Sequence, residues 1–284
     1  MSKTLEEALG AALKRAEAGA PQKLAHALQY AVFPGGARVR PRLCLAVAQA
    51  CGDSAPELSV ASAAALELLH CASLVHDDLP CFDNAAVRRG KPSVHRAFGE
   101  PVALLAGDAM IVLAFELLGR AGATNPSRLP ALTVTLAQAV GSPFGIVAGQ
   151  AWEAEASVPI DTYHQTKTGS LFTAATMMGA LAAGEDPLPW RTMGEKLGAA
   201  YQVADDLLDC VATVAEAGKP TRRDVALDRP NAVSRLGVEG AVSRLERLVG
   251  EAVESVPECP GRQGLRNLVM QIADRLVPES LRAA

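Results

Sequence analysis

The sequence predicts an all-α protein that folds as a single domain. Apolar residues recur with helical periodicity along almost the whole chain of 284 residues, and no stretch shows the strict apolar–polar alternation of a half-buried strand. Aromatic residues make up only 4% of the chain while alanine and leucine are abundant, which favours helices over a β-sandwich or barrel. Because 49% of the residues are apolar and no long linker or repeat interrupts them, we expect one helical domain over residues 1–284.

The individual helices follow from the apolar periodicity between residues that interrupt a helix. Proline lacks the backbone N–H that an inner helical turn needs, and glycine readily adopts conformations that end a helix. Such breaks occur at residues 33–36, 52–53, 84–92, 124–126, 186–187 and 217–224. The helices expected between them cover residues 3–18, 21–32, 40–51, 57–78, 93–98, 101–121, 127–141, 143–156, 160–183, 190–215, 230–236, 238–256 and 262–282.

The charge pattern argues against nucleic acid as a partner. The net charge is −4, and the basic groups alternate with carboxylates without interleaved aromatic side chains. The sequence contains no P-loop and no glycine-rich strand-to-helix turn, and no Ser/His/Asp or Cys/His arrangement follows from the spacing. Any anion site must therefore be built locally, and no protein nucleophile is expected.

The expected compartment is the cytoplasm. Six scattered cysteines form no CxxC pair, which is typical of ordinary buried thiols in a reducing environment. The N-terminal stretch is charged and amphipathic and lacks the apolar core of a signal peptide. The most apolar stretch, Pro101 to Leu118, contains Asp108 and Glu116 and is too short and too charged by this criterion to span a bilayer. We therefore expect no membrane span.

Two acidic clusters at the ends of apolar segments indicate a functional site. The first is His76-Asp77-Asp78-Leu79-Pro80-Cys81-Phe82-Asp83 and the second is Gln202-Val203-Ala204-Asp205-Asp206-Leu207-Leu208-Asp209. A carboxylate taken out of water must be neutralised or coordinated. One Asp-Asp-x-x-Asp match is explained equally well as a solvated helix end. Two matches, each behind a long apolar run, indicate carboxylates gathered around a cation.

Helix geometry supports this interpretation. Asp205 and Asp209 are four residues apart and share one helix face. In the first cluster an ideal helix would separate Asp77 and Asp83 by about 120°, so we expect Pro80 to end or kink the helix and to return Asp83 towards Asp77. Ligands that are all carboxylate oxygens suit Mg²⁺ or Mn²⁺ rather than Zn²⁺.

Basic residues near these clusters suit the recognition of a diphosphate. Magnesium bound by carboxylates usually has phosphate as a further ligand. Arginine binds phosphate through two parallel hydrogen bonds, and lysine acts as a point charge. His70 lies on the same helix face as Asp77, two turns earlier. The basic candidates are Arg38 and Arg40 after the Gly35-Gly36 turn, Arg88 and Arg89 after the first cluster, Lys167 beside Thr168, and Lys219 after the second cluster.

These stretches together match a known family. In order between residues 35 and 224, the motifs are GGARVRPRL, LHCASLVHDDLPCFDNAAVRRGKPSVH, LLAGDA, GQAWE, KTGSLF, YQVADDLLD and GKPTRRD. On these motifs the chain resembles the trans-isoprenyl diphosphate synthases, most closely the bacterial geranylgeranyl diphosphate synthases of carotenoid and photosynthetic-pigment pathways. The resemblance implies a single bundle of helices around a deep apolar cavity, and a homodimer.

The resemblance also assigns roles to the candidate residues. Six aspartates would hold three Mg²⁺ ions, with Mn²⁺ able to substitute, on the diphosphate of an allylic substrate: Asp77, Asp78, Asp83, Asp205, Asp206 and Asp209. The positions that match contacts to the allylic diphosphate are Arg88, Lys167, Thr168, Gln202 and Lys219. Those that match contacts to isopentenyl diphosphate are Arg40, His70 and Arg89. The family usually has lysine where this chain has Ala37, so that contact is missing or is supplied by Arg38.

The reaction implied by the resemblance is the head-to-tail condensation of isopentenyl diphosphate with an allylic diphosphate through an allylic carbocation. In the family the residue five positions before the first aspartate often closes the pocket floor. Here it is the small Ala72, followed by Ser73, so we expect a twenty-carbon product from farnesyl diphosphate unless another side chain such as Met110 closes the floor. The alternatives are a synthase that gives farnesyl or geranyl diphosphate, a non-catalytic regulatory subunit of a prenyl synthase, and a terpene cyclase.

Overall fold

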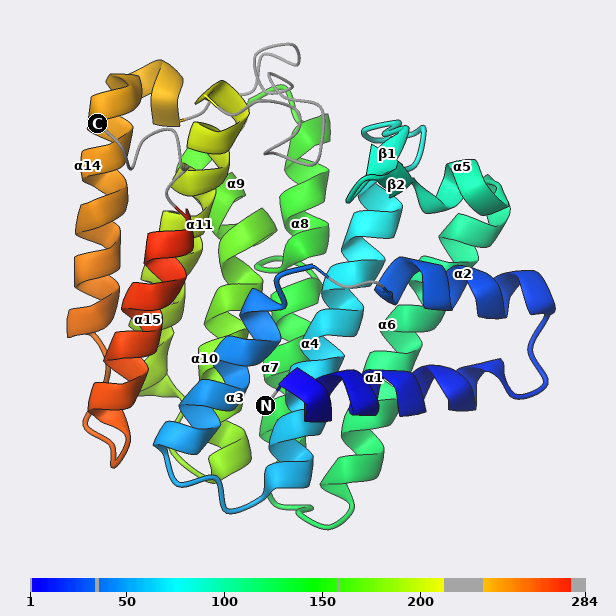
Figure 1. The fold of residues 1–284 in the computed structure, drawn as a ribbon, viewed down its shortest axis with the longest axis horizontal. Coiled ribbons are helices and arrows are strands. Elements are labelled where there is room, and N and C mark those ends of the chain that lie inside the picture. Colours follow the sequence, from blue (N-terminus) through cyan, green and yellow to red (C-terminus); the bar gives the residue numbers. More distant parts are fainter. Residues whose placement is uncertain (1, 34–35, 158, 212–231, 277–284) are drawn as a thin grey trace. The chain divides into compact units, whose positions relative to one another are not determined.

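The computed structural model describes residues 2–33, 36–157, 159–211 and 232–276, which are mostly helical (Figure 1). The prediction of an all-α protein is confirmed. In the described residues the exception is a short antiparallel hairpin formed by β1 (Val87–Arg88) and β2 (Lys91–Pro92). The chain divides into two compact units. Unit 1 comprises Met1–Gln49, Asp53–Leu136 and Met178–Glu185, and unit 2 comprises Ala50–Gly52, Ala137–Met177 and Asp186–Ala284. The single domain stays a prediction.

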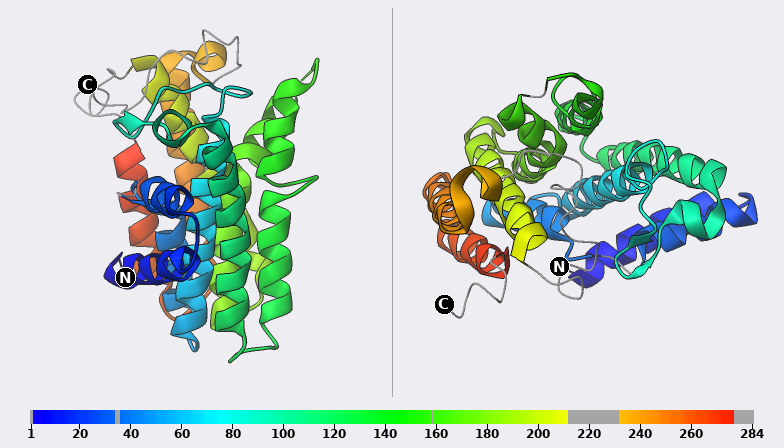
Figure 2. Two further views of the ribbon diagram at one scale, coloured as in Figure 1. Left: turned by 90° about the vertical axis from the view of Figure 1, so that its right-hand side faces the viewer. Right: turned by 90° about the horizontal axis from the view of Figure 1, so that it is seen from above.

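Unit 1 is built around one long apolar helix, α4 (Pro56–Asp77), most of whose side chains are buried. The helix α6 (Glu100–Gly122) runs beside it in both Figure 1 and Figure 2. The N-terminal helices of the unit contact this pair. The remaining helices that begin in unit 1 are α1 (Ser2–Glu17), α2 (Gln22–Val32), α3 (Val39–Ala50), α5 (Val94–Phe98) and α7 (Leu129–Val140).

The close approach of α4 and α6 depends on glycine at position 107. A Cβ atom added to Gly107 would lie only 2.0 Å from Nε2 of His76. That imidazole nitrogen instead lies 3.2 Å from the carbonyl oxygen of Leu104 and 3.7 Å from a carboxylate oxygen of Asp108, both on α6. The last turn of α4 is therefore held directly against the α6 backbone.

Unit 2 is centred on α11 (Arg191–Val211), which packs against α14 (Ala232–Glu254). Alanine, valine and leucine side chains from both helices form its core. The helix α15 (Arg262–Leu276) lies beside α14, as Figure 2 also shows. Its other elements are α8 (Ile146–Ala151), a 3₁₀-helix (Trp152–Ala154), α9 (Ile160–His164), a π-helix (Gln165–Gly169), the start of α10 (Ser170–Ala183) and a 3₁₀-helix (Leu188–Trp190).

Most helix boundaries match the expected ones within a few residues, and two expected helices differ. The helix expected at 143–156 begins only at Ile146 and changes to a 3₁₀-helix at Trp152. The helix expected at 160–183 contains the π-helix of residues 165–169. The break expected between 236 and 238 is confirmed, because Gly237 has non-helical angles (φ 71°, ψ 173°) within α14. The expected ends at 215 and 282 lie outside the described residues.

Two helices of the described residues are long and apolar enough to cross a membrane when judged by length and composition alone, namely α4 and α6. The prediction that the stretch 101–118 is too short is wrong on length, because α6 extends to Gly122 and has 23 residues. Buried core helices pass the same test, and α4 is one of them because 78% of its apolar window is buried. Only 39% of the window of α6 is buried, so that helix has an exposed apolar face.

Candidate active site

The first acidic cluster forms a tight turn at the end of α4. Pro80 cannot donate a backbone hydrogen bond and disfavours a helical residue before it, which accounts for the end of the helix at Asp77. The chain then folds back, so that the backbone N–H of Asp83 donates to the carbonyl of Asp77 (3.0 Å) and that of Ala85 donates to the carbonyl of Asp78 (3.1 Å). The expected return of Asp83 towards Asp77 is therefore confirmed.

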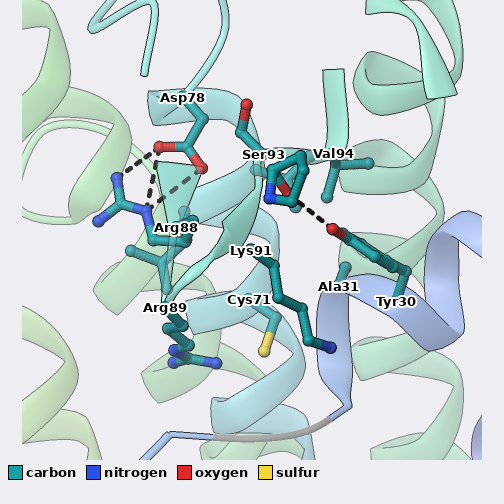
Figure 3. A pocket seen from close by; sticks show the side chains of 12 residues that line it. Tyr30, Ala31, Cys71, Asp78, Arg88, Arg89, Lys91, Ser93 and Val94 are labelled. Atoms are coloured by element: carbon teal, nitrogen blue, oxygen red, sulfur yellow. Dashed lines mark hydrogen bonds and ion pairs between the residues drawn. The ribbon is translucent and has the colours of Figure 1, made fainter. Parts of the chain in front are cut away.

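Asp78 is held by Arg88 from the neighbouring hairpin (Figure 3). Nη2 of Arg88 donates to Oδ1 of Asp78 at 2.5 Å, and Nε donates to the same carboxylate at 3.0 and 3.2 Å. Burial raises the pKa of Asp78, the hydrogen bonds from Arg88 oppose this, and the charges of Asp77 and Asp83 raise the pKa further. Three negative charges thus crowd one partly buried turn, which is an environment that a bound cation would stabilise.

The donor set of this turn fits magnesium. Within the described ranges, no three His, Cys, Asp or Glu side chains are grouped closely enough to hold a metal ion by themselves. Magnesium does not need such a cage, because it usually binds to one or two carboxylates and completes its octahedron with water and substrate phosphate. The carboxylates of Asp77, Asp78 and Asp83 are of this kind.

A cluster of positive charge surrounds His70 in unit 1. Its pKa is lowered well below the usual value by burial first, and then by the charges of Arg40, Arg89, Arg88 and Arg38. The structure therefore brings together the three residues expected at the isopentenyl diphosphate site, His70, Arg40 and Arg89. Arginine side chains beside a neutral histidine are suited to a polyanionic ligand, because a guanidinium can donate two parallel hydrogen bonds to a phosphate group.

The glycine-rich turn before α3 contributes to the same region. A Cβ atom on Gly36 would lie 2.8 Å from Nη2 of Arg89, so the guanidinium of Arg89 lies directly beside this glycine. Arg89 itself has a positive φ of 53°, and Figure 3 shows its side chain turned away from Asp78, unlike that of Arg88. A pocket lined by Arg88, Arg89 and Lys91 opens beside them. Ala37, where the family usually has lysine, is exposed next to this turn.

Arg38 does not belong to this basic surface. It is buried, and its guanidinium binds two carboxylates of unit 1 and a carbonyl. Nε and Nη2 donate to Glu6 (2.9 and 3.2 Å), Nη1 donates to Glu67 (2.5 Å), and Nη2 donates to the carbonyl of Val32 (2.9 Å). The guanidinium of Arg38 is thus engaged inside the protein, and its binding of isopentenyl diphosphate in place of a lysine at position 37 stays a prediction.

The positions expected to control product length lie in the second-last turn of α4. Ala72 is buried, and Ser73 is partly buried with its hydroxyl donating to the carbonyl of His70 at 2.8 Å. Met110 on α6 is also buried. The role of these side chains in product length stays a prediction.

In unit 2 the expected contacts of the allylic diphosphate lie on the π-helix and on α11. The hydroxyl of Thr168 donates to Oε1 of Gln202 (2.7 Å), and Nε2 of Gln202 donates to Oδ1 of Asp206 (2.9 Å). The other carboxylate oxygen of Asp206 accepts the backbone N–H of Ala232 at 2.7 Å. Asp206 therefore caps the first turn of α14, where its negative charge is favourable to the helix dipole.

The other residues of the second cluster differ in exposure. Asp205 is partly buried and Asp209 is buried, both on α11 in unit 2. The first cluster belongs to unit 1 and the second to unit 2. Lys219 lies outside the described residues.

Sequence reasoning missed one residue, Glu153. Its Oε1 accepts hydrogen bonds from Lys167 (2.5 Å) and Tyr163 (2.6 Å), and its Oε2 accepts one from Gln150 (3.0 Å). The signal that could have found it is the GQAWE motif, whose glutamate it is, although the spacing alone assigns that residue no role.

Comparison with known proteins identifies the class to which this fold and site belong. The polyprenyl synthetase family model matches residues 21–260. The chain belongs to the polyprenyl synthetase family and is a prenyl transferase. It is similar to the geranylgeranyl diphosphate synthase of Cereibacter sphaeroides, with 53% identity over 280 residues that cover 98% of this chain and 97% of the relative. The geranylgeranyl diphosphate synthase of Rhodobacter capsulatus is 50% identical over 278 residues, covering 98% and 96%.

Solved structures support the same fold. A geranyltransferase from Legionella pneumophila has a TM-score of 0.81 and 31% identity, covering 96% of this chain and 94% of its own. A geranyltransferase from Helicobacter pylori, solved in complex with magnesium and isoprenyl diphosphate, has a TM-score of 0.80 and 31% identity, covering 90% and 89%. The predicted isoprenoid synthase-like fold and the predicted family are both confirmed.

Proposed function

We propose that this protein condenses isopentenyl diphosphate with farnesyl diphosphate to give geranylgeranyl diphosphate. The observation that carries the proposal is the cluster of Arg40, His70 and Arg89, because a second diphosphate site distinguishes a chain-elongating synthase from an enzyme with one substrate. The similarity to geranylgeranyl diphosphate synthases over almost the whole chain supports the twenty-carbon product.

A product assay tests the proposal. Purified protein is incubated with labelled isopentenyl diphosphate, farnesyl diphosphate and Mg²⁺, and the products are separated by chromatography. The expected result is geranylgeranyl diphosphate. In a parallel assay geranyl diphosphate replaces farnesyl diphosphate, and a product that stops at fifteen carbons there would indicate a shorter-chain synthase. A cyclic hydrocarbon would indicate a cyclase, and no product with either starter would indicate a regulatory subunit.

Magnesium is the proposed cofactor, with three ions at the two acidic clusters and Mn²⁺ able to replace it. The hard carboxylate donors of the first turn support this, as does the magnesium in the related Helicobacter structure. When bound, Mg²⁺ withdraws charge from the leaving diphosphate and thereby promotes cleavage of the allylic C–O bond. Asp77, Asp78, Asp83, Asp205 and Asp209 are the proposed ligands. Asp206 contributes to this site while it also caps α14.

The basic residues orient the two substrates. Arg88, Lys167, Thr168 and Gln202 bind the allylic diphosphate in this proposal, together with Lys219. Arg40, Arg89 and the neutral His70 bind the isopentenyl diphosphate, whose double bond then attacks the allylic cation and whose proton leaves to the released diphosphate. Holding both substrates in line is worth up to about 7–11 kcal/mol of the barrier. The buried apolar side of α4 supports the exclusion of water from the cation.

The product length is proposed to depend on Ala72. Ala72→Tyr is expected to change the main product from twenty to fifteen carbons, because a phenol ring would fill about one isoprene unit of space. Chromatography of the products checks this, with the unfolding temperature as a measure of whether the buried site accommodates the ring. The neighbouring variant Ser73→Ala, which adds no volume, serves as control. An unchanged product from a folded Ala72→Tyr protein would contradict the assignment.

The alanine at position 37 is expected to limit the affinity for isopentenyl diphosphate. Ala37→Lys should lower the KM for isopentenyl diphosphate about tenfold, because an ammonium beside the Gly36–Arg89 contact would add a charge-assisted bond to the diphosphate. The KM for the allylic substrate should not change. Ala37→Met, which has a similar length and no charge, is the control. Equal effects of Lys and Met at this position would show that charge plays no part.

A second copy of the chain is the proposed partner, and the cytoplasm is the proposed compartment. The exposed apolar side chains of α6 support a homodimer over membrane contact, because Asp108 and Glu116 lie along the same helix. Leu104, Leu105 and Val112 are about half exposed or more, at 48%, 55% and 67%. Burial of such a patch is typical of a permanent interface. The molar mass in solution, measured by light scattering, tests this. Supply of a twenty-carbon precursor to carotenoids remains part of the proposal.

A further inference from the structure

Glu153 joins three segments of unit 2 at one carboxylate. It lies in the 3₁₀-helix that follows α8, and it accepts hydrogen bonds from Gln150 on α8, Tyr163 on α9 and Lys167 on the π-helix. The two donors to Oε1 are close, with Lys167 at 2.5 Å and Tyr163 at 2.6 Å. The carboxylate of Glu153 thus binds Lys167, which is proposed to contact substrate, and also binds Gln150 and Tyr163, which are not.

The ion pair with Lys167 is largely removed from water. The side chain of Glu153 is 19% exposed and that of Lys167 is 21% exposed. An ion pair in such surroundings is screened less than one on the open surface, so it constrains the lysine more strongly. A free lysine side chain loses rotamer entropy when it binds a ligand. Glu153 removes part of that freedom before the ligand arrives.

The same stretch also fixes the backbone of Lys167. A Cβ atom on Gly149 would lie 2.5 Å from both Cα and N of Lys167, so α8 packs directly against the π-helix there. Glu153 follows Gly149 by about one turn. The Tyr163 ring, whose hydroxyl is fixed by Glu153, lies 5.7 Å from the ammonium of Lys167. The backbone of Lys167 is therefore constrained by Gly149, and its ammonium by Glu153 and the ring of Tyr163.

We propose that Glu153 is a positioning residue that holds Lys167 in the conformation that binds the allylic diphosphate. The proposal rests on the proposed function, because it takes Lys167 as a ligand of that diphosphate. Glu153 acts through Lys167 and touches neither substrate. Its removal leaves a mobile ammonium, which lowers the affinity for the allylic diphosphate and the rate of its cleavage but leaves the isopentenyl diphosphate site intact.

A double-mutant cycle tests this coupling. The variants are Glu153→Gln, Lys167→Ala and the double variant, and kcat and KM are measured for each substrate with Mg²⁺. Lys167→Ala is expected to lower kcat/KM for the allylic diphosphate about 100-fold or more, and Glu153→Gln about tenfold or more. The double variant should be no worse than Lys167→Ala, and the KM for isopentenyl diphosphate should stay within about threefold of the parent.

Two further variants separate positioning from a general effect on the fold. Glu251 forms an ion pair with Lys196 in the same unit at 2.6 Å, with side chains 31% and 36% exposed, and it also pairs with Arg247. Glu251→Gln removes a carboxylate of unit 2 outside the proposed substrate site and should leave kcat/KM unchanged. Glu153→Asp, which keeps the charge on a shorter stem, should recover part of the activity lost in Glu153→Gln.

The outcomes of the cycle are distinguishable. Independent, multiplicative losses in the double variant would overturn the proposal, because Glu153 would then act without Lys167. Unchanged kinetics in Glu153→Gln, or kinetics that follow stability alone, would overturn it as well. Full activity in Lys167→Ala would instead refute the role of Lys167 in the proposed function, whatever Glu153 does.

Discussion

Replacing Asp78 with asparagine is expected to lower kcat/KM by about 10³-fold or more while the protein stays folded. The carboxylate is 2% exposed and sits in the turn proposed to bind magnesium. Loss of one charged ligand there removes several kcal/mol of stabilisation of the leaving diphosphate, and each 1.4 kcal/mol is about tenfold in rate. The fold should tolerate the change, because an amide oxygen can still accept both hydrogen bonds that Arg88 donates to Oδ1. Steady-state kinetics over a range of Mg²⁺ concentrations measure the loss.

The control for Asp78→Asn removes a negative charge elsewhere in unit 1. Glu116 is exposed on α6 and pairs only one turn away with Arg120, so Glu116→Gln should leave kcat/KM within about twofold. If Asp78→Asn retained more than a tenth of the activity with an unchanged dependence on Mg²⁺, Asp78 would not be a metal ligand.

Replacing Arg38 with methionine is expected to lower the free energy of unfolding by about 3–5 kcal/mol. Breaking a buried ion pair by removing one partner leaves the other charge without compensation. Here the charge left behind is Glu67, whose side chain is 2% exposed, while Glu6 lies nearer the surface. Urea unfolding followed by circular dichroism measures the change.

An exposed ion pair in the same unit provides the matched control for Arg38. Arg120 and Glu116 are four residues apart on α6, and the arginine side chain is 64% exposed. Arg120→Met should therefore lower the free energy of unfolding by less than about 0.5 kcal/mol. A loss below about 1 kcal/mol for Arg38→Met would mean that this ion pair adds little to stability. If Arg38→Met greatly raised the KM for isopentenyl diphosphate without lowering stability, Arg38 would be a residue that binds this substrate.

The helices were predictable because their patterns are local. The apolar run before Asp77 and the proline at position 80 specify both the course of α4 and its end. The return of Asp83 followed from the same proline. Even the interruption of α14 at Gly237 could be placed, because glycine tolerates the positive φ found there.

Other features depend on contacts between distant residues and left no local pattern. The π-helix at 165–169 has the sequence Gln-Thr-Lys-Thr-Gly, which does not distinguish it from a turn of an ordinary α-helix, and Gly149 packs closely on Lys167 there. The proposed role of Glu153 depends on its contacts with Tyr163 and Lys167, which are ten and fourteen residues away in the sequence. Arg38 looked like its neighbour Arg40 in the sequence, and only the fold shows that Glu6 and Glu67 face it.

Gly107 on α6 leaves room for the imidazole of His76, which directly precedes the proposed magnesium ligand Asp77. A Cβ atom at this position would lie 2.0 Å from Nε2 of His76, so a larger residue requires the imidazole beside Asp77 in the sequence to move. Gly107 is not among the residues proposed to bind substrate. Its small size nevertheless allows the end of α4 to pack closely against α6. Random mutagenesis followed by selection for activity should therefore retain glycine at position 107. Variants with a larger residue there should be inactive, although the changed residue lies on α6 and not in the proposed site.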